Sequence, residues 1–228
     1  MVGIIGAMSI ETDALIEKMQ ERKVDAVGEY SFYHGKICGK DAVVCRCGVG
    51  KVAASSAAVL MAYLFNPKAI INIGVAGGVK PLKQGDIVVA EHSVQHDYDG
   101  VADGLELGQV HGYNSPYFEC DRGIVGQICQ VLDRNGYAYK TGTMATGDCF
   151  VSNKDKAMHI AQTFGAISFD METAAINQVC QMQGIRFCAM RAISDNGDDT
   201  AVKSFYEFLT EASQKSIDVI TEFIATFA

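Results

Sequence analysis

Three acidic residues follow apolar segments, in a pattern that could support acid–base chemistry. Glu172 follows the apolar segment 167–171, Asp195 follows the segment 186–194, and Glu11 lies about one helical turn beyond the first apolar segment. The carboxyl ends of parallel strands meet at one edge of a sheet, where ligands bind. We therefore expect the three carboxyl groups to meet in one crevice, where they could exchange protons with a small polar molecule.

Each of these residues also has a structural interpretation. Glu11 falls in the first turn of a predicted helix, where a carboxylate stabilises the helix dipole by about 0.3–1 kcal/mol. Glu172 could begin the next helix, and Asp195 could begin a turn in the polar segment 195–199. Arg191 is expected inside the sheet, where a buried arginine needs a carboxylate partner such as Glu11 or Glu172. The occurrence of all three acids after apolar segments, rather than any single acid, favours a catalytic role over the structural interpretations.

Short apolar segments alternate with longer helical patterns along the chain. Strands are predicted at residues 2–5, 31–37, 41–47, 69–73, 86–90, 140–147, 167–171 and 186–194, and helices at 9–20, 51–65, 121–135, 154–164, 173–183 and 205–227. This alternation predicts an α/β fold of three layers, with a central, mostly parallel, mixed and twisted sheet flanked by helices. No linker or repeat interrupts the pattern, so residues 1–228 are predicted to form a single domain.

Composition excludes several classes of partner. The net charge of −8 argues against nucleic acid and against an anionic membrane surface. The eight cysteines contain no C-x-x-C pair, which indicates free thiols in a reducing compartment. There is no signal-peptide pattern and no apolar run of membrane-spanning length. We therefore expect a cytoplasmic protein.

Other motifs favour simpler interpretations. The sequence Gly48-Val49-Gly50-Lys51 lacks the spacing of a Walker A or a dinucleotide-binding loop. The glycine-rich segment 74–78 is interpreted as a tight turn after a strand. The long segment 91–118 is expected to be a lid, a binding loop or an interface, and its acidic cluster is expected to be solvated. Cys149 has no base near it in the sequence. No metal and no cofactor are predicted.

Several motifs in order along the chain together resemble one family. They are Gly3-Ile4-Ile5-Gly6-Ala7-Met8 with Glu11, Gly48-Val49-Gly50-Lys51-Val52-Ala53-Ala54, Gly74-Val75-Ala76-Gly77-Gly78, Gly147-Asp148, Met171-Glu172 and Arg191-Ala192-Ile193-Ser194-Asp195. The set is similar to the bacterial 5′-methylthioadenosine/S-adenosylhomocysteine nucleosidases of the purine nucleoside phosphorylase superfamily. The resemblance covers nearly the whole chain.

The resemblance implies hydrolysis of the bond between adenine and a 5′-thio-substituted ribose. In that case Asp195 would protonate N7 of adenine, with Ser194 holding its carboxyl group in place. Glu11 would activate the attacking water, with Arg191 nearby, and Glu172 would bind the ribose hydroxyls.

The resemblance also implies a set of substrate contacts and a homodimer. Phe150 would stack on the purine, the backbone of Val151 would bind the purine edge, and Met171 would lie against the sugar. Phe205 would line the pocket for the 5′-alkylthio group, together with Met8 from the neighbouring subunit. The substrate pocket would thus be completed by a partner.

Two departures leave alternatives open. Val75 stands where some members of the family carry serine, and the loop 97–116 does not match clearly, so the preferred 5′ substituent stays open. The remaining alternatives are a 6-amino-6-deoxyfutalosine nucleosidase, a phosphate-dependent purine nucleoside phosphorylase and an inert nucleoside-binding module. Phosphorolysis is disfavoured because the first strand–helix turn offers Glu11 and no arginine before Arg22.

Overall fold

The computed structural model describes residues 1–198 and 201–227, and it describes no side chains at residues 202–204 and 207. The strands are β1 (Val2–Gly6), β2 (Gln20–Val27), β3 (Tyr30–Ile37), β4 (Lys40–Arg46), β5 (Ala69–Gly78), β6 (Ile87–Gln95), β7 (Tyr117–Glu119), β8 (Tyr139–Thr146), β9 (Ala166–Asp170) and β10 (Arg186–Asp195). The helices are α1 (Ser9–Glu17), α2 (Lys51–Phe65), α3 (Arg122–Arg134), α4 (Lys154–Phe164), α5 (Thr173–Gln183) and α6 (Ala201–Thr226), with a short 3-10 turn, η1, at Val101–Asp103.

The strands form one mixed sheet that closes on itself at one end. The strands β4, β1, β5 and β10 are parallel neighbours in its middle. On one side, β3 and β2 continue the sheet as an antiparallel hairpin. On the other side, β10, β6, β8 and β9 follow in turn, and β9 pairs back onto β5 through Gly77 and Gly78. The predicted mixed sheet is confirmed, with five parallel and five antiparallel pairings among the described strands.

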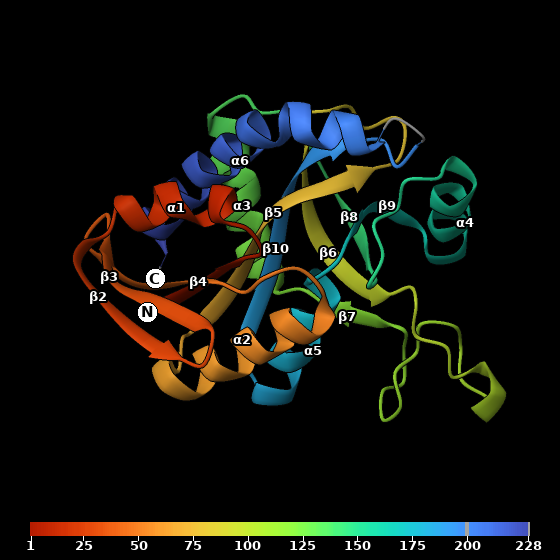
Figure 1. Cartoon of the computed structure of the whole chain (residues 1–228), viewed down its shortest axis with the longest axis horizontal. Helices are drawn as coiled ribbons and strands as arrows, with labels where there is room; N and C mark the ends of the chain where they lie inside the picture. Colours follow the sequence, from red (N-terminus) through yellow and green to blue (C-terminus); the bar gives the residue numbers. More distant parts are fainter. Residues whose placement is uncertain (199–200, 228) are drawn as a thin grey trace.

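Helices cover both faces of this sheet, which confirms the predicted three layers (Figure 1). Helices α1, α3 and α6 pack on one face, and α2 and α5 pack on the other. Alternate residues of β10 serve the two faces: Met190 contributes to the first apolar cluster and Ala189 to the second. Both faces of the strand are buried, which explains its continuous apolar sequence.

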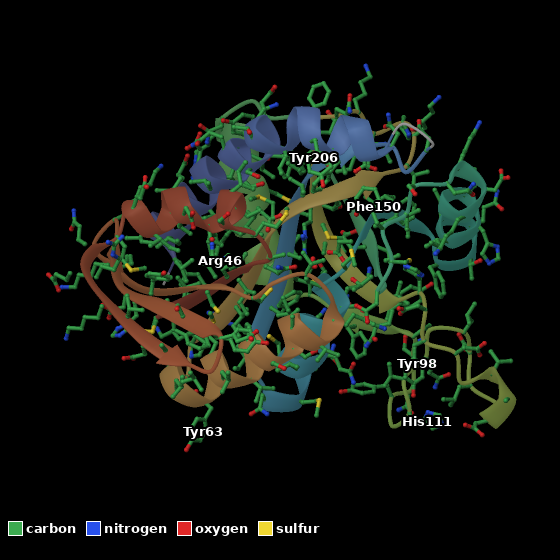
Figure 2. All side chains as sticks on the ribbon, viewed as in Figure 1. Arg46, Tyr63, Tyr98, His111, Phe150 and Tyr206 are labelled. Atoms are coloured by element: carbon green, nitrogen blue, oxygen red, sulfur yellow. The ribbon has the colours of Figure 1, made fainter. Side chains whose placement is uncertain are left out.

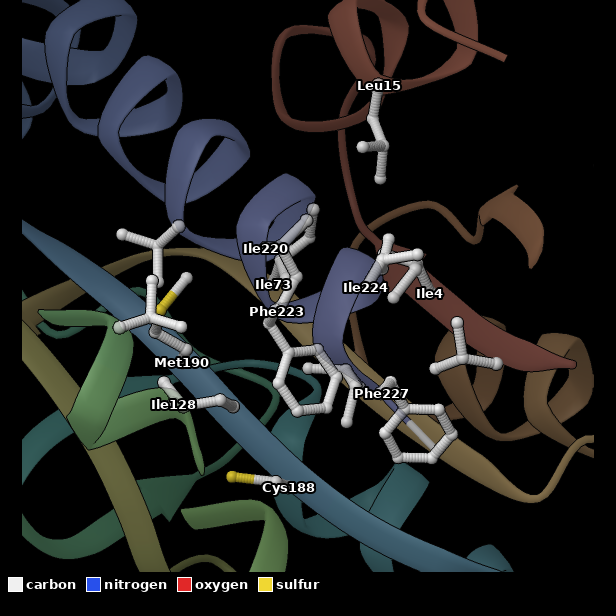
Figure 3. Packing of buried hydrophobic residues seen from close by; sticks show 14 of the residues in the cluster. Ile4, Leu15, Ile73, Ile128, Cys188, Met190, Ile220, Phe223, Ile224 and Phe227 are labelled. Atoms are coloured by element: carbon white, nitrogen blue, oxygen red, sulfur yellow. The ribbon is translucent and has the colours of Figure 1, made fainter. Parts of the chain in front are cut away.

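Helix α6 buries its apolar stripe against the first face of the sheet. Figure 3 shows Phe223 and Phe227 of α6 in this cluster together with Ile4 of β1 and Met190 of β10. The apolar residues whose periodicity predicted this helix therefore lie on the side of α6 that contacts the sheet.

Strands β2 and β5 differ from the prediction. Strand β2 was not predicted, because all eight of its residues are exposed and mostly polar. Strand β5 was expected to end at Ile73, but it continues to Gly78, so the interpretation of residues 74–78 as a turn is wrong. The glycine-rich segment stays extended because it pairs with β10 and then with β9.

The segment 91–118 is more ordered than predicted. Strand β6 continues to Gln95 and pairs with β7, and the chain between them makes turns around η1. Tyr98 and His111 meet across this loop, with 2.8 Å between Oη and Nδ1 (Figure 2). Within residues 1–198 and 201–227, no helix is both long enough and apolar enough to cross a membrane.

Candidate active site

A cavity of about 570 Å³ lies where β5, β9 and β10 and the N-terminal turn of α1 meet. Every residue that the sequence predicted for the site lines this one cavity. These residues are Met8, Glu11, Val75, Phe150, Val151, Met171, Glu172, Arg191, Ser194, Asp195 and Phe205. The closed arrangement of strands therefore gathers side chains that are up to 197 positions apart in the sequence, from Met8 to Phe205.

Glu11 is held by three backbone N–H groups. Its Oε2 accepts hydrogen bonds from Ala7 N at 2.7 Å and Met8 N at 2.9 Å, and its Oε1 accepts one from Val75 N at 3.1 Å. Burial raises the pKa of Glu11, although the charge of Arg191 and the three N–H groups lower it. Glu11 thus both caps the start of α1, as its structural interpretation required, and faces the cavity.

Gly74 allows Glu11 and Arg191 to approach the backbone of β5. A Cβ atom at this position would lie 2.5 Å from Oε1 of Glu11 and 2.7 Å from Nη1 of Arg191. Its φ of +151° is also one that residues with a side chain rarely adopt. Glycine is therefore required at position 74 because Glu11 and Arg191 lie so close to the backbone, and not because the chain turns there.

Arg191 is buried and pairs with two carboxylates. Its Nη2 lies 3.1 Å from Oε2 of Glu172 and 3.1 Å from Oδ2 of Asp170, and it donates to Oδ1 of Asn72 at 2.6 Å. The pairing with Glu172 was one of the two predicted, whereas Asp170 and Asn72 were not. The acidic residues at the end of β9 contained the signal for Asp170, but its role as a partner of Arg191 depends on the fold.

Asp170 is held in turn by two threonines. Thr146 Oγ1 donates to its Oδ1 at 2.5 Å, and the hydroxyl of Thr173 donates to its Oδ2. These contacts and the ion pair to Arg191 occupy the carboxylate. Asp170 therefore holds Arg191 and the start of α5 in place.

Glu172 contacts the glycine loop that precedes α2. Gly50 N donates to Oε1 of Glu172 at 3.0 Å. The sequence of this loop lacks a phosphate-binding motif, and in the structure the loop contacts a carboxylate instead. Burial raises the pKa of Glu172, the charge of Arg191 lowers it, and nearby Asp170 raises it further. Glu172 is therefore a weaker acid than an exposed glutamate.

Asp195 lies at the end of β10, beside an irregularity in the strand. Ile193 pairs with Ala76 and Asp195 with Gly77, which leaves Ser194 as an extra residue. Such a bulge changes the direction of the side chains that follow it. Ser194 Oγ donates to Oδ2 of Asp195 at 2.8 Å, so the bulge places a hydroxyl beside the carboxyl group.

The surroundings of Asp195 favour its protonated form. Burial raises the pKa of Asp195, while the hydrogen bonds from Gly197 N at 2.9 Å and from Ser194 lower it by less. A carboxyl group with a raised pKa can act as a proton donor.

Aromatic side chains form the apolar part of the cavity. The rings of Phe150 and Phe205 are 5.6 Å apart and perpendicular, and the ring of Phe205 also contacts Tyr206. Figure 2 shows Phe150 and Tyr206 on the same side of the molecule. Met8 lines the cavity of its own chain, so the expectation that it reaches in from a neighbouring subunit is wrong. Met8 directly precedes α1, the helix that also supplies Glu11, and this short separation keeps both in one cavity.

The sequence did not predict nine further residues that line the cavity. They are Ala7, Val49, Ala76, Gly77, Cys149, Ser152, Phe169, Asp170 and Tyr206. Most are direct neighbours of predicted residues, so extending each motif by one position would have found them.

The cavity is acidic. Four carboxyl groups, those of Glu11, Asp170, Glu172 and Asp195, line it beside the single guanidinium of Arg191. In the described part of the chain, no three His, Cys, Asp or Glu residues are grouped as metal ligands. Such a site can transfer protons and stabilise positive charge, and it disfavours a bound anion.

Comparison with known proteins agrees with this arrangement. The sequence profile of the phosphorylase superfamily matches residues 1–225. The chain is 38% identical over 225 residues to the 5′-methylthioadenosine/S-adenosylhomocysteine nucleosidase of Haemophilus influenzae (strain PittEE), with 98% of each chain covered.

Solved structures give the same result. The nucleosidase of Neisseria meningitidis in complex with methylthio-immucillin-A superposes with a TM-score of 0.96 at 34% identity, with 99% of each chain covered. The S-adenosylhomocysteine nucleosidase of Streptococcus pyogenes in complex with 5-methylthiotubericidin also gives 0.96, at 33% identity, covering 100% of this chain and 97% of the other. The chain therefore belongs to the 5′-methylthioadenosine/S-adenosylhomocysteine nucleosidase family of the phosphorylase superfamily.

Proposed function

We propose that this chain hydrolyses the N-glycosidic bond of 5′-methylthioadenosine and of S-adenosylhomocysteine, releasing adenine and the 5-thioribose product. Family membership supports the reaction. The single structural observation that supports it most is that Glu11 and Asp195, two buried carboxyl groups with raised pKa values, line one cavity. Hydrolysis of this bond needs a proton for the base and an activated water for the sugar.

Asp195 is the general acid in this proposal. As the bond to ribose breaks, negative charge develops on adenine, and the proton of the Asp195 carboxyl group passes to N7. Ser194 holds Oδ2 and Gly197 N holds Oδ1, so the carboxyl group keeps one orientation. General acid catalysis of this kind contributes about 10²–10⁴-fold to the rate.

Glu11 and Glu172 act on the sugar. Positive charge develops on ribose in the transition state, and nearby carboxylates stabilise it. Glu11 accepts the proton of the attacking water, while its three backbone contacts hold it in place. Glu172 binds the ribose hydroxyls, oriented by Arg191 and by Gly50 N.

The apolar part of the cavity binds the rest of the substrate. Phe150 stacks on the purine, the backbone of Val151 binds the purine edge, and Met171 lies against the sugar. Phe205 and Met8 contact the 5′-alkylthio group. Val75 contributes its backbone N–H to Glu11 and offers no hydroxyl to the water or ribose.

Phosphorolysis is the competing reaction, and the charges in the cavity argue against it. A phosphate near ribose requires cations, but the guanidinium of Arg191 is paired with Asp170 and Glu172, and Glu11 lies beside it. The test is adenine release from each nucleoside with and without added phosphate. We expect equal rates in both conditions. Strict dependence on phosphate would contradict hydrolysis, and substrate binding without adenine release would indicate an inert binding module.

The proposed assembly is a homodimer whose partner subunit completes the 5′-alkylthio pocket. Helix α2 exposes Val52, Val59 and Tyr63, which fall on one side of the helix at steps of seven and four residues. Val49, just before α2, is 56% exposed and lines the cavity, so the cavity wall continues into this apolar surface. The cytoplasm is the proposed compartment, and the eight free cysteines support it.

A further inference from the structure

A second cavity of about 350 Å³ adjoins the first and shares Cys149 with it. Six of its nine lining residues are polar, and they include two histidines, a lysine and Cys149. The polar lining residues are His96, Asp97, Asp148, Cys149, Lys156 and His159. None of the roles proposed above uses this group.

The thiol of Cys149 lies next to a cation and a base. Lys156 Nζ is 3.2 Å from its Sγ, and Nε2 of His96 is 3.9 Å away. The ammonium group of Lys156 therefore places a positive charge directly beside the sulfur that would act as the nucleophile. Burial lowers the pKa of His96, so its ring is neutral near pH 7 and can accept the thiol proton.

The other cysteines are in different surroundings. Five are buried, and burial raises the pKa of each: Cys45, Cys47, Cys120, Cys180 and Cys188. Burial also raises the pKa of the partly buried Cys129. Cys38 is exposed, and the contact of its thiol is a carbonyl oxygen, that of Thr221, at 3.9 Å. Cys38 therefore serves as an exposed reference thiol whose contact is a carbonyl oxygen rather than an ammonium group.

We propose that Cys149 is a modification site that forms a mixed disulfide with small-molecule disulfides, and that the attached group closes the nucleoside cavity. The Cys149 thiolate attacks one sulfur of the disulfide, and a new S–S bond forms as the original one breaks. The leaving thiolate takes the electron pair and then a proton, which balances the proton lost by Cys149. Closure follows because Cys149 lines the nucleoside cavity and directly precedes Phe150.

The rate of modification tests the reactivity of Cys149 independently of catalysis. Full-length protein is treated with a limiting amount of bis(2-hydroxyethyl) disulfide, and peptide mass spectrometry measures the occupancy of each cysteine over time. We expect Cys149 to react at least about 10-fold faster than Cys38 at neutral pH. Lys156→Gln should slow Cys149 alone, whereas Lys154→Gln, on the same helix turn, should not. Equal rates at Cys149 and Cys38 would overturn the proposal.

The second part, closure of the cavity, rests on the proposed function. Adenine release should fall in proportion to Cys149 occupancy and return after dithiothreitol. Cys149→Ser, compared with its own untreated sample, should lose this sensitivity. Full occupancy of Cys149 with unchanged adenine release would refute closure. If untreated protein releases no adenine, the proposed function fails, and protection of Cys149 by bound adenine then tests closure instead.

Discussion

At the scale of single residues, the surroundings of the two proposed catalytic carboxyl groups differ. Glu11 accepts hydrogen bonds from three backbone N–H groups, which favour its ionised form. Burial raises the pKa of both groups, but Asp195 accepts from only one backbone N–H and one hydroxyl, so fewer hydrogen bonds oppose the effect of burial there. This difference supports the assignment of Glu11 as base and Asp195 as acid.

Asp195→Asn should abolish proton donation while keeping the shape of the site. Ser194 Oγ is 3.3 Å from the carbonyl oxygen of Ala76, so the hydroxyl can donate there and accept from the new amide. We expect kcat for adenine release to fall by about 10²–10⁴-fold with little change in KM. Asp13→Asn, an exposed change on α1, is the control and should keep full activity. Near-full turnover by Asp195→Asn would remove Asp195 from its proposed role.

The same substitution should change the pH dependence of stability. The folded-state pKa of Asp195 is raised above its ordinary value of 3.8. The protonated carboxyl group therefore makes its full contribution to the free energy of unfolding at pH values below 3.8. That stability is lost as the pH rises through the folded-state pKa. Asp195→Asn should therefore unfold at a higher temperature than the native chain at pH 8, with a gain that shrinks as the pH approaches 4. Thermal unfolding of both proteins across this range measures the difference, and a constant or growing gain on acidification would contradict it.

At the scale of elements, β5 and β10 arrange the site. Both strands extend past the length expected from their sequences, and their parallel pairing brings Gly74 opposite Arg191 and Gly77 opposite Asp195. The bulge at Ser194 occurs within this pairing. Small changes in β5 should therefore affect both stability and activity.

Gly74→Ala is expected to damage both. The added methyl group would lie 2.5 Å from Glu11 Oε1, and overpacking of this kind costs about 1–3 kcal/mol. We expect a lower free energy of unfolding in urea titrations and at least a tenfold loss of adenine release, because Glu11 must move. Gly126→Ala is the matched control: Gly126 is exposed on α3 with open space at its Cβ, so alanine should stabilise the chain by about 0.5–1 kcal/mol. Equal behaviour of the two variants would refute this account of Gly74.

At the scale of the whole molecule, the closed group of strands places the cavity beside helices α1 and α6 and near the exposed side of α2. The cavity wall at Val49 is solvent-exposed in the single chain, which is why we propose that a second subunit covers it. Val52 and Tyr63 on α2 are 78% and 86% exposed. Surfaces with such apolar side chains commonly form interfaces.

A double variant, Val52→Glu with Tyr63→Glu, should separate the proposed subunits. Sedimentation should report twice the mass of one chain for the native protein and a single-chain mass for the variant. We expect the variant to release adenine more slowly, mainly through a higher KM, because the 5′-alkylthio pocket loses one wall. Val24→Glu, on the exposed strand β2 and outside the α2 surface, should change neither property. A native protein that sediments as one chain with full activity would contradict the dimer.

Local patterns in the sequence were sufficient for the α/β class, for three helices whose bounds match the structure, and for the carboxyl groups at the strand ends. Helices α2, α4 and α5 begin and end where predicted. Periodicity and strand–helix alternation depend only on residues that are close in the sequence, so they can be interpreted without knowing the fold. Because of this, the motifs around Glu11, Glu172 and Asp195 could be recognised in order.

Only the tertiary structure decided how these residues meet. The Gly50–Glu172 contact joins residues 122 positions apart, the ion pair of Arg191 with Asp170 depends on two strands and a helix start, and the bulge at Ser194 follows from pairing with β5. The Lys156–Cys149–His96 group likewise comes from three separate segments: α4, the loop between β8 and α4, and the residue after β6. Contacts of this kind depend on which strands become neighbours, and strand order is set by packing of the whole chain rather than by any local pattern.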